Sequence, residues 1–162
     1  MKTKLVTVNA LIAALYTVLT LVSSFFGIAY GPVQLRLSEI FALLPAVNVS
    51  FIPGVVLGCA ISNLFSFNML DCVFGTAASL IAAVFTYLLR KHKIRGIPVF
   101  SAIPPIIVNS LIIGAQITLF LSNEATFTAF VYSAITVALG QTVVMCLGLI
   151  LFPFFKKILD KF

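Results

Sequence analysis

A short polar string near residue 35 holds the side chains with the clearest capacity for chemistry. Gln34, Arg36 and Glu39 fall within Gln-Leu-Arg-Leu-Ser-Glu, residues 34–39, in an otherwise strongly apolar region. Amide and ionisable groups are costly in apolar surroundings and usually serve a function, here hydrogen bonding to a polar molecule. Further polar side chains that could join them are Asn63, Asp71, Asn109, Gln116, Tyr132 and Gln141.

Catalysis is the weaker interpretation of these residues. Only Glu39 and Asp71 are suited to acid–base work, and nothing in the sequence places them together. His92, the single histidine, sits among four cations and is therefore a poor base or metal ligand. The chain has no H-E-x-x-H, G-x-S-x-G or G-x-x-x-x-G-K-[ST] motif. We expect no enzyme activity, cofactor or metal site, and any ATP chemistry must belong to another chain.

The composition predicts that a membrane surrounds these groups. The residues AVILMFWYC make up 62% of the 162 residues, 9% are charged, and the mean hydropathy is +1.22. Soluble domains are about half apolar and a quarter charged. A pass needs about 20 residues, so we expect an all-α polytopic membrane protein with one domain, 1–162. Its net charge is +6. The Lys and Arg residues are concentrated at three places, which indicates membrane topology rather than nucleic-acid binding.

The positive charges decide how many helices cross. The region 40–67 could be one kinked helix or two short ones joined by a turn near residues 48–51. Two short helices place nine of the ten Lys and Arg residues in the cytoplasm with both termini, and only Arg36 outside. We therefore predict six helices, with the first break at Gly27, Tyr30, Gly31 and Pro32. Their expected ranges are 5–26, 38–49, 53–67, 71–89, 99–121 and 127–155.

In this topology most polar groups lie toward the outer side, which predicts a small polar pocket open to the outside. The outer loops hold Gln34, Arg36, Glu39, Asn68, Asp71, Asn123 and Glu124. Asn63, Gln116 and Tyr132 lie just below them, and Asn109 and Gln141 lie deeper. Asn109 and Gln141 could instead bond each other between helices.

Structural alternatives exist for the charged residues as well. Arg36 and Glu39 are three residues apart and could pair on one helical turn. Ser38 could cap the second helix, with Glu39 favoured near its positive end. Asp71 could cap the fourth helix. Asn123 and Glu124 are typical turn residues.

Small residues recur at four-residue spacing, which allows helix backbones to approach closely within lipid. The third and fourth helices carry such rows, and the first carries Ala10 and Ala14, which could contact another membrane subunit. The rows in the third and fourth helices are Gly54, Gly58 and Ser62, and Gly75, Ser79 and Ala83. Cys59, Cys72 and Cys146 lie in or beside apolar segments, and we interpret them as packing residues.

The string 34–39, continuing to Leu44-Pro45, resembles the QueT family. These proteins are substrate-capture (S) subunits of energy-coupling factor (ECF) transporters for queuosine precursors. The resemblance extends through the segments 53–63 and 70–76 and is dense from about residue 29 to 83. It implies a six-helix bundle of the ECF S-component type in a bacterial cell membrane.

The resemblance also implies partners and a ligand. A transmembrane coupling subunit with two cytoplasmic ATPases would dock on Ala10 and Ala14 of an A-x-x-x-A motif. The ligand would be a 7-deazaguanine such as preQ0, preQ1 or queuine, whose adjacent N–H donors a carboxylate can accept in pairs. Glu39 is the first candidate for that role.

The remaining pocket residues receive implied roles from the same resemblance. A donor to the exocyclic oxygen could come from Gln34, Arg36, Asn63, Asn109 or Gln141. Tyr132 or Phe74 could stack on the ring. Asp71 could offset an aminomethyl charge, and Gln116 completes the candidate set.

Three other functions fit the same sequence. The chain could be an S-subunit for a different vitamin, or a self-contained ion-coupled transporter with Glu39 or Asp71 as its proton site. It could also be a structural subunit of a larger membrane complex.

The predicted topology is tested by cysteine labelling. Cysteines introduced at Lys93 and Asn123 should react with an impermeant reagent from opposite sides, inside and outside respectively. Labelling of both from one side would contradict the six-helix arrangement.

Overall fold

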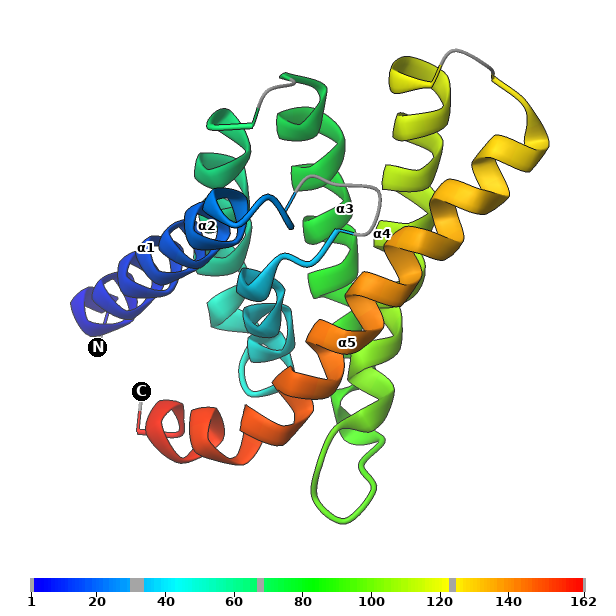
Figure 1. Cartoon of the computed structure of the whole chain (residues 1–162). Coiled ribbons are helices and arrows are strands. Elements are labelled where there is room, and N and C mark those ends of the chain that lie inside the picture. The colour runs from blue at the N-terminus through cyan, green and yellow to red at the C-terminus, as the bar shows by residue number, and fades with distance from the viewer. Residues whose placement is uncertain (1, 30–33, 67–68, 123–124, 162) are drawn as a thin grey trace.

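The computed structural model describes residues 2–29, 34–66, 69–122 and 125–161, and these are almost entirely helical (Figure 1). The long helices are α1 (Lys2–Phe25), α2 (Ile52–Leu64), α3 (Met69–Leu88), α4 (Ile103–Gln116) and α5 (Phe127–Leu159). The 3₁₀ segments are η1 (Leu37–Ala46), η2 (Val49–Phe51), η3 (Leu89–Lys91) and η4 (Val99–Ala102), and a π-helical segment, η5 (Ile117–Leu121), continues α4.

Within the part of the chain that the structure describes, four helical stretches are long and apolar enough to cross a membrane. They are Thr3–Phe25, Met69–Lys91, Val99–Phe120 and Phe127–Leu159, and two shorter apolar stretches are Leu37–Ala46 and Val49–Leu64. Their outward faces carry large apolar side chains, such as Leu11 and Ile150, that are more than half exposed. The fold is therefore the expected all-α membrane bundle, and the protein is multi-pass.

The region from residue 37 to 64 is divided in two by the turn at Val47 and Asn48. Asn48 has an extended backbone, and its side-chain oxygen accepts a hydrogen bond from the backbone N–H of Ser50 at 3.0 Å. This caps the next helical segment, as Asn commonly does. Pro53 then occupies the first turn of α2, where its missing N–H costs nothing.

The short helix η1 forms the centre of the bundle. Eight of its ten residues are buried, and it packs against α1, α3 and α5. Figure 1 shows this cyan segment surrounded by the long helices. Leu43 and Leu44 have exposed fractions of 0% and 1%, so the apolar side of η1 fills the middle of the fold.

Helices α1 and α2 approach closely because α2 presents glycines to α1. A Cβ added at Gly58 would lie 2.7 Å from the Tyr16 Cβ and 2.9 Å from the Ala13 carbonyl oxygen. A Cβ at Gly54 would lie 2.8 Å from the Asn9 carbonyl oxygen. These contacts hold the buried face of α1 against the bundle. Ala10 and Ala14, in contrast, lie on its exposed face.

Several sequence predictions fall outside the described residues. They are the break at Tyr30, Gly31 and Pro32 and the outer positions of Asn68, Asn123 and Glu124.

We predict that Gly58→Val destabilises the protein by about 1–3 kcal/mol, because the added methyl groups would overlap α1. Thermal unfolding in detergent measures this. Leu57→Val is the matched control, since it places the same β-branched residue on the exposed side of the same helix. An unchanged melting temperature for Gly58→Val would show that α1 and α2 are not held this closely.

Candidate binding site

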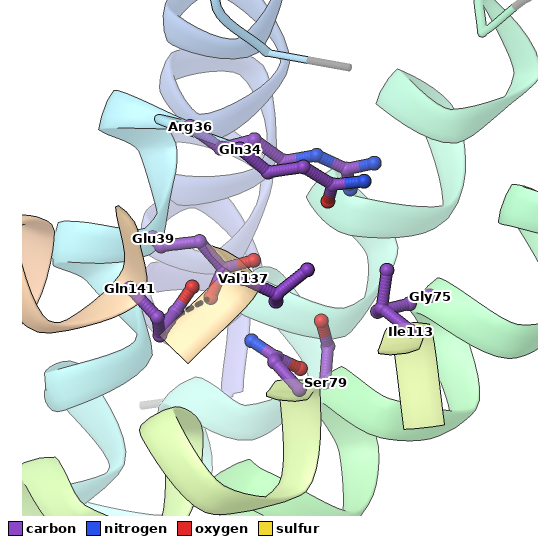
Figure 2. A pocket seen from close by; sticks show the side chains of 9 residues that line it. Gln34, Arg36, Glu39, Gly75, Ser79, Ile113, Val137 and Gln141 are labelled. Atoms are coloured by element: carbon purple, nitrogen blue, oxygen red, sulfur yellow. Dashed lines mark hydrogen bonds between the residues drawn. The ribbon is translucent and has the colours of Figure 1, made fainter. Parts of the chain in front are cut away.

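One cavity gathers polar side chains from four parts of the bundle (Figure 2). Gln34 and Arg36 precede η1 and lie side by side over the cavity, while Glu39 extends from η1 below them. Helices α3, α4 and α5 complete the lining with Gly75, Ser79, Asn109, Ile113, Val137 and Gln141. Residues from across the sequence therefore meet at one polar place inside an apolar bundle.

Glu39 is the buried acidic group of this cavity, with an exposed fraction of 4%. The Tyr16 hydroxyl of α1 donates to its Oε1 at 2.5 Å. The Gln141 side-chain amide of α5 donates to its Oε2 at 3.3 Å. A buried carboxylate is costly unless hydrogen-bonded, so these two donors explain how the group is accommodated.

Arg36 brings a positive charge to the same cavity and is 6% exposed. Its Nε donates to the Ala29 carbonyl oxygen at 3.2 Å, and its NH1 group donates to the Asn63 side-chain oxygen at 2.9 Å. The guanidinium is therefore held by two directed hydrogen bonds, one to the segment after α1 and one to α2.

The hydrogen-bond network continues from Asn63 to Cys59, which also packs in the hydrophobic core, as the sequence predicts. The Asn63 amide donates to the Cys59 sulfur at 3.3 Å, and the Ser79 hydroxyl donates to it at 3.1 Å. The thiol itself points to the Gly75 carbonyl oxygen, 3.6 Å away. Cys59 thus joins the Arg36 side of the site to α3.

Ser38 does not cap the helix, so that alternative is wrong. The helix starts at Leu37, and the cap position is Arg36, whose side chain makes no capping bond. Ser38 lies inside the first turn, and its hydroxyl is 2.6 Å from that of Thr20 on α1. The Leu37 N–H instead donates to the Ser23 hydroxyl at 3.1 Å. Side chains of α1 therefore hold the start of η1.

Five of the candidate residues predicted from sequence line the cavity, and a sixth, Asn63, adjoins it through Arg36. The five are Gln34, Arg36, Glu39, Asn109 and Gln141. Among the described residues no hydrogen bond joins Asn109 to Gln141. Gln141 bonds Glu39 instead.

The other candidates lie elsewhere in the structure. The Gln116 amide donates to Asp71 at 2.5 Å, which forms a separate link between α3 and α4. Tyr132 is 66% exposed on α5. The Phe74 ring packs against Phe120, with centroids 5.6 Å apart. The structure does not bring these four residues to the cavity around Glu39.

Tyr16 and Ser79 belong to the site but were not among the candidates. A usable signal for Tyr16 exists in the sequence. Val8, Ile12, Tyr16 and Thr20 recur every four residues and are all buried, so they share one face of α1. A phenol on that face requires a buried hydrogen-bond partner. Ser79 stands in a row of small residues and carries no comparable signal.

The cavity is suited to hold a small polar ligand but is narrow. Its free volume is about 10 Å³, roughly that of one water molecule. Ligand pockets generally measure about 300–1,000 Å³. A two-ring ligand therefore fits only when lining side chains move aside. A carboxylate has about four acceptor positions, and within the described residues Glu39 receives two donors, so it can accept more.

The apolar helical bundle defines the class of this protein, a multi-pass membrane protein. Its internal polar cavity, lined by side chains of opposite charge, has the features of a small-molecule site. The chain belongs to the QueT transporter family, whose family model matches residues 6–157.

One curated relative is the "Queuosine precursor transporter QueT" of Lactococcus lactis subsp. cremoris (strain MG1363). It is 39% identical over 72 residues, which cover 44% of this chain and 43% of the relative. The match thus spans less than half of the relative's length. No solved structure matches the chain.

Proposed function

We propose that this chain is the substrate-binding subunit of an ATP-driven ECF-type importer in a bacterial cell membrane. Its substrate is a queuosine precursor: preQ0, preQ1 or queuine. The observation that carries the proposal is Glu39, a buried carboxylate facing a polar cavity in a member of the QueT transporter family. The termini are cytoplasmic, as the distribution of Lys and Arg favours.

The chemistry of the cavity supports a 7-deazaguanine ligand. A guanine-like edge presents two adjacent N–H donors, which one carboxylate can accept together. Glu39 takes this role. The exocyclic oxygen next to those donors needs a donor in turn, and Arg36, Asn109 and Gln141 line the same cavity. Glu39 can accept these donors beside those that it receives from Tyr16 and Gln141.

ATP-driven import requires ATPases on partner chains, because this sequence contains no P-loop motif. The coupling subunit docks on the outer face of α1. Ala10 and Ala14 are exposed there, four residues apart, and their small side chains let another helix approach closely. Tyr16 lies on the opposite, buried face and bonds Glu39. One helix thus carries the partner surface and a contact to the substrate site.

The substrate site is tested by titrating purified protein with preQ0, preQ1 and queuine. Glu39→Gln should weaken binding by about 30- to 1000-fold, equivalent to about 2–4 kcal/mol. The amide keeps the size but replaces one acceptor with a donor. Tyr16 can still donate to its remaining oxygen, so the fold should persist.

Asp160→Asn is the matched control, because it makes the same carboxylate-to-amide change just beyond the end of α5. It should bind like the wild type. Near-native affinity of a folded Glu39→Gln variant would remove Glu39 from the site. Aggregation of that variant would instead favour a purely structural role for the carboxylate.

The partner surface is tested by Ala10→Leu and Ala14→Leu. Both residues are exposed, so the isolated subunit should keep its fold and its ligand affinity. Copurification with the coupling subunit and uptake by cells should be lost, because the larger side chain separates the two helices.

Ala77→Leu makes the same change on an exposed position of α3 and should leave assembly intact. Unchanged copurification of the α1 variants would refute docking on α1. Uptake that an ionophore abolishes, but that persists without the ATPases, would point to a self-contained ion-coupled transporter.

A further inference from the structure

A second cavity, of about 340 Å³, lies where the loop after α3 meets the C-terminal end of α5. Three cations line it: Arg95 from the loop, and Lys156 and Lys157 from α5. Among the described residues of its lining Asp160 is the one acidic residue, so their formal charges sum to +2. This cavity shares no lining residue with the one around Glu39.

A tight turn holds Arg95 beside α5. Ile94 and Ile97 exchange backbone hydrogen bonds of 2.9 and 3.0 Å. The two residues between them have positive φ angles, 52° at Arg95 and 82° at Gly96. Hairpins of this type favour Asn or Gly at the first position, and a long side chain there is conformationally unfavourable. The turn nevertheless places the Arg95 guanidinium at the cavity.

Helix α5 supplies the other wall. Pro153 interrupts its hydrogen bonding, and Figure 1 shows the red end of α5 crossing the end of the bundle. Lys156 and Lys157 stand in the last turn, where cations are favoured by the helix dipole. That explanation does not extend to Arg95, which belongs to another segment. Within the described residues, no carboxylate lies within 4.0 Å of these three cations.

Apolar side chains share the lining of the charged cavity: Ile97 from the turn, and Phe152 and Pro153 from α5. Ile150, less than one turn before Phe152 on the same helix, is 73% exposed. A ligand that suits both surfaces has an anionic head and a hydrocarbon tail. Basic pockets between membrane helices bind anionic lipid headgroups in this way.

We propose that this cavity binds the headgroup phosphate of an anionic phospholipid, with its acyl chains along α5. Arg95, Lys156 and Lys157 hold the phosphate. A soluble phosphate would offer the same anion without the chains, so the experiment compares the two. The proposal does not depend on the substrate or on a coupling partner.

The test is native mass spectrometry of the delipidated full chain, titrated with phosphatidylglycerol, phosphatidylcholine or inorganic phosphate. We expect one phosphatidylglycerol to bind at least about ten-fold more tightly than phosphatidylcholine. Each charge near a lipid headgroup changes affinity about five-fold. The double variant Lys156→Gln/Lys157→Gln should therefore lose about 25-fold, and Asp160→Asn should gain about five-fold.

Lys91→Gln/Lys93→Gln is the matched control, since it removes two charges of the same loop that do not line the cavity. It should leave the affinity unchanged. Arg95→Gln, in a separate segment, should lose about five-fold and replaces the α5 variant if that one does not fold. Equal loss in the control, equal binding of phosphatidylcholine, or inorganic phosphate binding as tightly as the lipid would each overturn the proposal.

Discussion

The rest of the structure depends on one constraint: a carboxylate buried in an apolar bundle must receive hydrogen bonds. Glu39 receives them from Tyr16 and Gln141, which belong to the first and last long helices. These two contacts span 23 and 102 residues of sequence. Folding that satisfies the carboxylate therefore also fixes how α1 and α5 stand against η1. A polar ligand that enters the cavity shares this carboxylate with the contacts that organise the bundle.

The two charges of the site are held by different means. Arg36 is anchored by a backbone carbonyl and by Asn63, whose amide continues to the Cys59 sulfur. Within the described residues, the Glu39 carboxylate is held by two side chains. Side-chain contacts can rearrange without moving the backbone, whereas the Ala29 carbonyl is part of the main chain. The Glu39 side chain can therefore change its hydrogen-bond partners more readily than Arg36 can.

The sequence predicts the architecture well, because membrane burial and charge distribution act on whole segments. The division of residues 37–64 followed from counting Lys and Arg, and the structure has a turn at Asn48. It predicts the site only in part. Gln34, Arg36 and Glu39 lie within six consecutive residues, but Tyr16 and Ser79 join them through contacts between distant segments. Ser38 shows that short-range interpretation also has a limit. The helix begins one residue earlier than predicted, so the Ser38 hydroxyl contacts Thr20 instead of capping the helix.

The helices differ greatly in length, and this gives the protein an uneven hydrophobic thickness. The stretch Val49–Leu64 rises only about 25 Å, less than the roughly 30 Å of a hydrocarbon core. The 33 residues of α5 extend about 50 Å before the bend at Pro153 is considered. A short stretch is accommodated by a thinner bilayer or by flanking side chains that reach the interface, and a long one by tilting. Membranes of different lipid chain length will therefore fit the α2 and α5 sides of the protein unequally.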